Sequence, residues 1–226
     1  MTPSPLSQNE LLQKYVNAVM AAPRSLGLTA TRDPVEFWER HVLDALKLIS
    51  LLPKAEHDKP FRVMDVGSGN GVPGIPIGIA VPNWQVNLLD SDNKKCGFLD
   101  MFCKSLSLNN IHVIAQRSEV AAHRPELREQ FDLVFARALG KLPVALELTL
   151  PFLKRNGTLI IPHGQSYKSE LPLINNALKE LGAAFKEAVS YPLNPEITFT
   201  ALFFLKIAET PERYPRNIGV PRKRPL

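Results

Sequence analysis

The chain has 226 residues, of which 45% are hydrophobic and 22% charged, which suits one domain or one domain with a small extension. No apolar run approaches the roughly 18 residues that a membrane span requires, and the first residues lack the basic and apolar segments of a signal peptide. The formal charge of +5 is uneven: residues 206–226 hold six Lys or Arg against two Glu, and basic ends of this kind commonly bind nucleic acid.

Two amphipathic helices are predicted before residue 53. Residues 8–21 carry apolar residues at helical spacing, and a second stripe follows Asp33 and Pro34, which suit an N-cap and the first helical position. The second stripe consists of Val35, Trp38, Val42, Leu46 and Ile49. We expect residues 1–60 to form a helical extension, with the proline-containing and charged stretch 53–60 as its linker.

From residue 61 onward, short apolar runs alternate with helical stretches. Strands are predicted at 61–66, 84–89, 111–115, 131–136 and 157–161, and helices at 74–80, 94–107, 118–129, 142–152 and 168–181. This alternation predicts parallel strands with crossover helices on both faces of a sheet. No helix separates the last two runs, 184–189 and 199–206, so these two strands must be antiparallel.

The expected fold is α/β, with a mostly parallel seven-stranded sheet, an antiparallel C-terminal hairpin and the N-terminal helical cap. This sheet is typical of Rossmann-like class I methyltransferases, which use S-adenosylmethionine (SAM), and not of dinucleotide-binding enzymes. Residues 61–207 are expected to form the methyltransferase domain, and residues 208–226 a basic C-terminal tail.

A glycine-rich loop, "VGSGNGVPGIPIG", follows the first predicted strand. A dinucleotide fingerprint requires its third glycine at position 72, but that position is Val72 and the glycine comes early, at Gly71. The spacing of Asp65, Gly67, Gly69 and Gly71 instead matches the SAM loop of methyltransferases. A tight strand-to-helix turn without a ligand is the alternative.

Acidic residues follow the second and third predicted strands, at the sheet edge where open α/β proteins bind ligands. Asp90 lies 25 residues after Asp65, close to where an acidic residue accepts hydrogen bonds from ribose hydroxyls, although it could instead cap the next helix. Ser91 and Asp92 are expected to frame the same pocket.

The third strand is followed by Arg117, Ser118 and Glu119. Methyltransferases hold the adenine amine at the positions of Ser118 and Glu119, although Glu119 could equally be a favourable charge in the first turn of a helix. Arg117 either faces the substrate or is an ordinary surface arginine.

The end of the fourth strand, "FDLVFARALGK", lacks the Pro-Pro-aromatic stretch of enzymes that alkylate exocyclic base amines. A cytosine-C5 enzyme needs a nucleophilic cysteine, but Cys96 and Cys103 lie in another predicted helix, where we expect free core thiols in a reducing cytoplasm. Guanine N7 suits such a site, because its lone pair carries no proton and catalysis is mostly positioning. No acid–base residue and no metal site are expected.

The chain resembles the bacterial small-subunit rRNA (guanine-N7) methyltransferase G family, also called glucose-inhibited division protein B, along nearly its whole length. The resemblance is carried by "LGLTATRDPVEFWERHVLDAL", residues 65–77, "LLDSDNKKCGFL", "FARAL" and "ERYPRNIGVPRKRPL". It implies methylation of one guanine in the decoding region of 16S rRNA, within the small ribosomal subunit. It also implies that the SAM pocket contains Gly67, Val72, Asp90, Ser91, Asp92, Ser118, Glu119 and Arg137. Arg137 is the one candidate for a direct part in catalysis.

The expected RNA-facing residues are Arg117, His163, Arg213, Arg216, Arg222, Lys223 and Arg224. His163 stands where the family often has a lysine, and Ala45 replaces the usual serine. His41 and Asp44 could position RNA or lock the N-terminal helices onto the sheet, and the structural role is favoured.

The tail is expected to be extended, because its prolines oppose a helix, and to bind phosphates away from the SAM pocket. Packing on the domain through Tyr214 and Ile218 is the alternative. We expect a monomer. A methyltransferase of another substrate and a non-catalytic ribosome assembly factor are the alternative functions.

Overall fold

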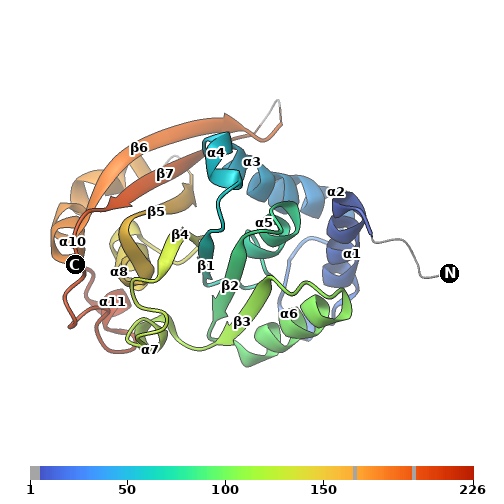
Figure 1. The fold of residues 1–226 in the computed structure, drawn as a ribbon, viewed down its shortest axis with the longest axis horizontal. Coiled ribbons are helices and arrows are strands. Elements are labelled where there is room, and N and C mark those ends of the chain that lie inside the picture. The colour runs from blue at the N-terminus through green and yellow to red at the C-terminus, as the bar shows by residue number, and fades with distance from the viewer. Residues whose placement is uncertain (1–5, 165–166, 195–196) are drawn as a thin grey trace.

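Seven strands form one sheet in the order β3-β2-β1-β4-β5-β7-β6 (Figure 1). The computed structural model describes residues 6–164, 167–194 and 197–226, so residues 1–5 of the expected N-terminal extension lie outside the described part. The strands are β1 (Arg62–Val66), β2 (Gln85–Asp90), β3 (Ile111–Ala115), β4 (Phe131–Ala136), β5 (Leu153–His163), β6 (Ala183–Pro192) and β7 (Thr198–Lys206).

The first five strands are parallel, whereas β7 runs antiparallel to both β5 and β6. The predicted sheet and its closing hairpin are therefore confirmed. The chain moves outward from β1 to β2 and β3 and then returns to place β4 on the other side of β1. This reversal is a topological switch point, where the crossover connections on the two sides of β1 leave room for a ligand.

Helices cover both faces of the sheet. One face carries α1 (Gln8–Ala21), α2 (Pro34–Phe37), α3 (Asp44–Ser50), α5 (Gly74–Ala80) and α6 (Asn93–Ser105). The other carries α8 (Leu142–Thr149) and α10 (Asn175–Leu181), with α7 (Ser118–Ala121) and α11 (Val220–Lys223) at its end (Figure 1). Alternate residues of a strand point to opposite faces, so β7 contributes Phe203 to one core and Phe204 to the other.

The second predicted helix is present but irregular. Asp33 caps it by accepting a hydrogen bond from the Val35 amide, and a π-helical turn, Trp38–Leu43, joins α2 to α3. Val35 begins the predicted apolar stripe but does not lie in the core, because its side chain is 62% exposed. The π-helical turn inserts a residue and so shifts the apolar face of the helix. The predicted linker 53–60 also contains a short helix, α4 (Lys54–His57).

Three predicted helices on the other face are shorter than expected. The helix predicted at 118–129 is only α7, and the helix predicted at 142–152 ends at Thr149, before a 3₁₀ turn at Leu150–Phe152. The helix predicted at 168–181 is divided into α9 (Tyr167–Glu170), a 3₁₀ turn (Leu171–Leu173) and α10. Pro172 interrupts this last helix, because proline cannot donate the backbone hydrogen bond that continues a helix.

The C-terminal segment packs on the domain, and the prediction of an extended tail is wrong. Tyr214 is buried, and the Arg216 guanidinium donates to both carboxylate oxygens of Glu147, a residue of α8 with no exposed surface. Ile218, the second predicted packing residue, is 57% exposed. The prolines also permit a helix, since Pro221 lies in the first turn of α11, where no amide donor is needed.

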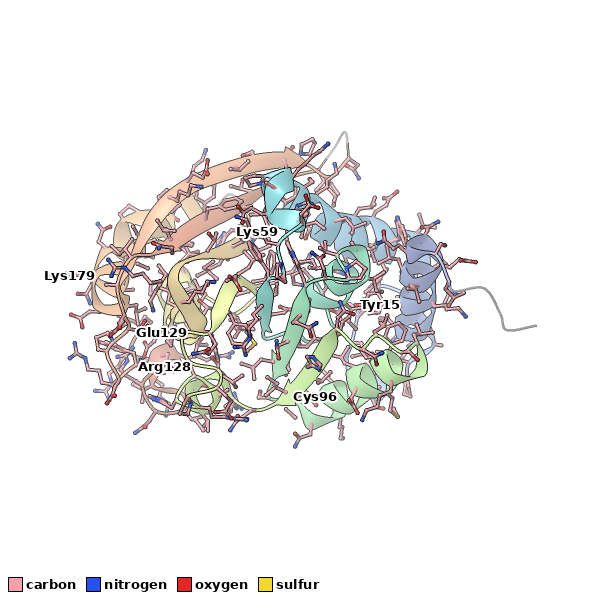
Figure 2. The ribbon with its side chains drawn as sticks, viewed as in Figure 1. Tyr15, Lys59, Cys96, Arg128, Glu129 and Lys179 are labelled. Atoms are coloured by element: carbon pink, nitrogen blue, oxygen red, sulfur yellow. The ribbon has the colours of Figure 1, made fainter. Side chains whose placement is uncertain are left out.

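Backbone carbonyls of the segment are held by the connection between α7 and β4. Arg128 donates to the carbonyls of Thr210, Pro211 and Tyr214, and Glu129 accepts from the Thr210 amide. Figure 2 shows Arg128 and Glu129 at the end of the sheet where the segment lies. These hydrogen bonds hold the irregular segment in place on the domain.

We expect the substitution Arg216→Ala to lower the free energy of unfolding by about 3 kcal/mol, since it leaves the buried Glu147 carboxylate without its cationic partner. Arg213→Ala is the matched control, because Arg213 pairs with Glu180 at an exposed site and its loss should change stability little. Urea unfolding at pH 7 measures both variants. Equal stability of the two variants would show that the buried pair does not hold the segment.

Candidate cofactor site

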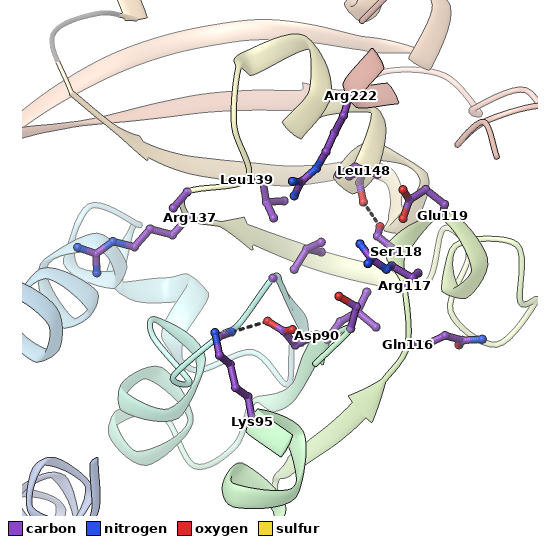
Figure 3. A pocket seen from close by; sticks show the side chains of 16 residues that line it. Asp90, Lys95, Gln116, Arg117, Ser118, Glu119, Arg137, Leu139, Leu148 and Arg222 are labelled. Carbon is purple, nitrogen blue, oxygen red and sulfur yellow. Dashed lines mark hydrogen bonds between the residues drawn. The ribbon is translucent and has the colours of Figure 1, made fainter. Parts of the chain in front are cut away.

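A cavity of about 270 Å³ lies at the carboxyl ends of β1 to β4, at the switch point of the sheet (Figure 3). Among the residues predicted for the site, the cavity is lined by Gly67, Asp90, Ser91, Arg117, Ser118, Glu119, Arg137 and Arg222. Segments distant in sequence therefore meet in one place. Arg222 was expected to face RNA away from the cofactor, and its position in the wall of this cavity corrects that expectation.

The glycine loop has a backbone that side chains would disturb. Gly67, Gly69 and Gly71 all have positive φ angles, of 74°, 55° and 98°. A Cβ atom on Gly67 would lie 2.4 Å from a methyl carbon of Leu139, another residue of the cavity wall. Val72 is buried in the same loop, but it does not line the cavity. The loop thus brings bare backbone to the cavity, as the sequence pattern predicts.

Asp90 organises the loop from the end of β2. Its Oδ2 accepts a hydrogen bond of 2.8 Å from the Gly69 amide (Figure 3). Its Oδ1 accepts one of 2.9 Å from the Asp92 amide. Asp90 does not cap the following helix. Asp92 does so, by accepting from the amides of Lys94 and Lys95, and its carboxylate lies outside the cavity wall. Each Asp90 oxygen retains a lone pair for a ligand.

Ser118 and Glu119 lie at the opposite wall, at the start of α7. The Ser118 hydroxyl donates to the Leu148 carbonyl at 2.5 Å, so it is fixed and can only accept from a ligand. Glu119 is buried and is not a solvated first-turn charge. Its Oε1 accepts from the Gly219 amide at 3.1 Å, and among the described residues its Oε2 has no hydrogen-bond partner.

Arg137 lines the cavity, but its guanidinium points toward the N-terminal helices (Figure 3). It donates to His41 Nδ1 at 3.1 Å and to the Arg40 carbonyl at 3.3 Å, and it lies 3.5 Å from an Asp44 carboxylate oxygen. Asp44 is buried and also accepts from the Tyr191 hydroxyl at 2.6 Å. These contacts confirm the favoured structural role of His41 and Asp44.

Burial sets the charges of this cluster. Desolvation and the adjacent Arg137 cation lower the pKa of His41 to about 4, so the imidazole is neutral at pH 7 and can accept the hydrogen bond from Arg137. Desolvation also raises the pKa of Asp44, while Arg137 and the Tyr191 hydroxyl oppose that rise. The cluster therefore joins the N-terminal helices, β4 and β6 at the edge of the cavity.

Three cations of the cavity wall have no ion-pair partner within the described part of the chain: Lys95, Arg117 and Arg222. Lys95 was not selected from the sequence, although its position three residues after the helix cap Asp92 places it on the first turn of α6, beside the cavity. The remaining predicted tail cations lie elsewhere. Arg213 and Arg216 pair with Glu180 and Glu147, and Lys223 and Arg224 are exposed and do not line the cavity.

A second, smaller cavity of about 200 Å³ adjoins the first at the carboxyl ends of β4 and β5. It shares Ala138 and Leu139 with the first cavity and is also lined by His163. His163 Nε2 lies 3.5 Å from a carboxylate oxygen of Glu170. The predicted RNA-facing histidine is therefore next to the candidate cofactor cavity.

Within residues 6–164, 167–194 and 197–226, no group of three or more His, Cys, Asp or Glu could hold a metal ion. In the same described part, the helices are too short or too polar to span a membrane.

Solved structures with the same fold include methyltransferases with low sequence identity to this chain. A 16S rRNA (adenine(1408)-N(1))-methyltransferase from Catenulisporales acidiphilia has a TM-score of 0.55 and 18% identity, over 70% of this chain and 90% of that one. A SAM dependent methyltransferase from Aquifex aeolicus also has a TM-score of 0.55, with 16% identity over 76% of this chain and 94% of that one. At these identities the similarity shows the class I methyltransferase fold.

Sequence relatives are much more similar. Ribosomal RNA small subunit methyltransferase G of Nostoc punctiforme is 37% identical over 226 residues, which cover 98% of this chain and 91% of the relative. The protein of the same name from Oenococcus oeni is 35% identical over 216 residues, covering 96% and 88%. A family model described as GidB, rRNA small subunit methyltransferase G, matches residues 8–191. The chain therefore belongs to the GidB family of rRNA small subunit methyltransferase G proteins.

Proposed function

We propose that this protein transfers the methyl group of SAM to N7 of one guanine in the decoding region of 16S rRNA. The proposal rests on the cavity at the switch point, whose wall contains the glycine loop and the carboxylates of Asp90 and Glu119. The chain that forms this cavity belongs to the family named above. Membership of an rRNA methyltransferase family implies an RNA substrate.

The cavity has the donors and acceptors that SAM requires. Asp90 would accept hydrogen bonds from the ribose hydroxyls, and the free Oε2 of Glu119 would accept one from the adenine amine. The loop at Gly67 would accommodate the methionine part, where a Cβ atom would collide with Leu139. When bound, SAM supplies an electrophilic methyl group.

N7 is the position that the surrounding residues favour. It carries no proton, so the site needs to hold the base in line and exclude water rather than remove a proton. A cysteine nucleophile is not available: burial raises the pKa of Cys96 to about 11 and that of Cys103 to about 12, so both remain thiols. The smaller cavity beside His163 offers a place for the target base.

The unpaired cations at the cavity wall, Lys95 and Arg117, would contact RNA phosphates beside the target nucleotide. The exposed Lys223 and Arg224 would extend this contact. We further infer that the protein acts as a monomer in the cytoplasm, where ribosomal RNA is found.

The test is transfer of a labelled methyl group from SAM to protein-free 16S rRNA and to intact small subunits. Methylation of N7 places a positive charge on the ring, so borohydride followed by aniline should cleave the product at one guanine. Methylated RNA that resists this cleavage would overturn the N7 assignment. If the protein binds SAM but transfers no methyl group to protein-free 16S rRNA and none to intact small subunits, the rRNA assignment is wrong.

A further inference from the structure

The C-terminal segment reaches the wall of the candidate cofactor cavity. Arg222, in α11, lines the cavity together with Asp90 and Glu119 (Figure 3). The Gly219 amide donates to Glu119 Oε1 across a separation of 100 residues in the sequence. The segment therefore contacts the carboxylate that would bind adenine.

Contacts upstream of Gly219 hold the segment in this position. The Arg216 side chain and its backbone amide donate to the buried Glu147 carboxylate. His123 donates to the Pro215 carbonyl at 2.9 Å, and Arg128 donates to the Tyr214 carbonyl at the same distance. Three successive residues are thus fixed by side chains of the domain, which directs the following residues toward the cavity.

Gly219 makes this contact from a left-handed backbone conformation. Its φ of 78° is left-handed, and it precedes the first turn of α11. Its amide fixes Oε1 of Glu119, and Oε2, which has no hydrogen-bond partner among the described residues, is free to bind a ligand. Fixing a carboxylate before the ligand arrives lowers the ordering cost of binding.

Arg222 supplies a second element. Its guanidinium has no ion-pair partner among the described residues, and it lies at the cavity beside Leu139 and Leu148 (Figure 3). A guanidinium is planar and stacks on the faces of aromatic rings, and adenine offers such a face.

We propose that residues 218–226 are part of the cofactor site: they fix Glu119 and place Arg222 against the nucleobase of the bound cofactor. This inference rests on the proposed position of SAM in the cavity. Gly219 is a positioning residue that acts through Glu119, whereas Arg222 contacts the ligand. The affinity of the protein for adenosine-containing ligands should therefore depend on its C-terminal segment.

The test measures the affinity for SAM and for 5′-methylthioadenosine by calorimetry without RNA. The second ligand contains the adenosine part but no sulfonium charge, which separates nucleobase contacts from charge effects. Truncation after Asn217 keeps the anchors Tyr214 and Arg216, and it should weaken both ligands about tenfold or more. Arg222→Ala should weaken both about threefold to tenfold. Lys223→Ala, the matched loss of one charge in the same helix, should stay within about twofold of wild type.

A double-mutant cycle tests whether the segment acts through Glu119. In the Glu119→Ala background, truncation should cost less affinity than in the wild type, because the carboxylate that Gly219 fixes is absent. A purely structural effect of truncation would be the same in both backgrounds. Thermal unfolding of each variant reports whether the domain remains folded.

Truncated protein that binds both ligands within about twofold of wild type would overturn the inference. Equal affinities of the Arg222→Ala and Lys223→Ala variants for both ligands would also overturn the inference. If the truncated chain does not fold, the comparison of these two variants is the test. Wild-type protein that does not bind SAM would instead refute the proposed function itself. The two failures are therefore distinguishable.

Discussion

Replacing Asp90 by alanine is expected to abolish measurable SAM binding while the domain remains folded. The Asp90 carboxylate is at the end of β2, where both of its oxygens can accept hydrogen bonds from the ribose hydroxyls. Hydrogen bonds to a charged group contribute about 1.5–3 kcal/mol each, so losing two should lower affinity by at least about a hundredfold. Isothermal titration calorimetry with SAM measures the effect.

The loss has a second cause within the protein. Asp90 also accepts hydrogen bonds from the amides of Gly69 and Asp92, which order the glycine loop and the turn after β2. Alanine would leave both amides without this acceptor, so the loop would have to be ordered when the ligand binds. The effect on affinity is therefore expected to exceed the effect on stability.

Asp100→Ala is the control for the loss of one negative charge. Asp100 is in α6, and its carboxylate pairs with Lys104 at an exposed site outside the cavity wall. Its substitution should leave SAM affinity unchanged. If the Asp90→Ala protein binds SAM within threefold of wild type, the ribose assignment is wrong.

Replacing Asp65 by asparagine is expected to remove a large pH dependence of stability. Asp65 has no exposed surface, its Oδ2 accepts from the Gly74 amide at 3.0 Å, and its Oδ1 has no partner among the described residues. Burial raises the pKa of Asp65 to about 7, against about 3.9 in an unfolded chain. The folded protein therefore holds a proton on Asp65 between these two values, whereas the unfolded chain does not.

The sign follows from proton linkage. Where the folded state binds more protons than the unfolded state, the free energy of unfolding falls as pH rises. The contribution of Asp65 is thus fully present below about pH 4 and lost as pH rises to about 7, a loss of about 4 kcal/mol. Asparagine resembles the neutral acid and does not titrate.

Urea unfolding between pH 4 and pH 9 measures this difference. At each pH, the free energy of unfolding of the wild type is compared with that of Asp65→Asn. The difference isolates Asp65, because other groups such as His41 titrate equally in both proteins. The variant should gain stability relative to wild type as pH rises, and the gain should level off above about pH 7. Parallel stability curves for the two proteins would show that Asp65 is ionised in the folded protein throughout this range.

The sequence by itself determined the sheet and the central part of the site. Periodicity separates strands from helices, and a missing helix between two strands requires the antiparallel pair β6 and β7. The positions of Gly67 and Asp90 follow from the same local information. Parallel strands end at one edge of the sheet, so residues that directly follow them must lie near one another.

Local signals also explain the boundaries that were predicted wrongly. Val35 continues an apolar stripe at helical spacing, but the π-helical turn after α2 changes which face is buried. The apolar periodicity of residues 168–181 predicts one continuous helix. Pro172 lies within this range and interrupts the helix with a 3₁₀ turn. Such errors concern one or two turns and leave the order of strands unchanged.

Only the tertiary structure decided the roles of the charged residues. Arg216 and Arg222 look alike in the sequence, yet Arg216 is bound to the buried Glu147 and Arg222 lines the candidate cofactor cavity. Arg137 lines the candidate cavity, as the sequence predicted, but His41 and Asp44 hold its guanidinium at the N-terminal helices. The partner of a charge is set by which distant segments pack together, and a charged residue carries no local pattern that records its burial.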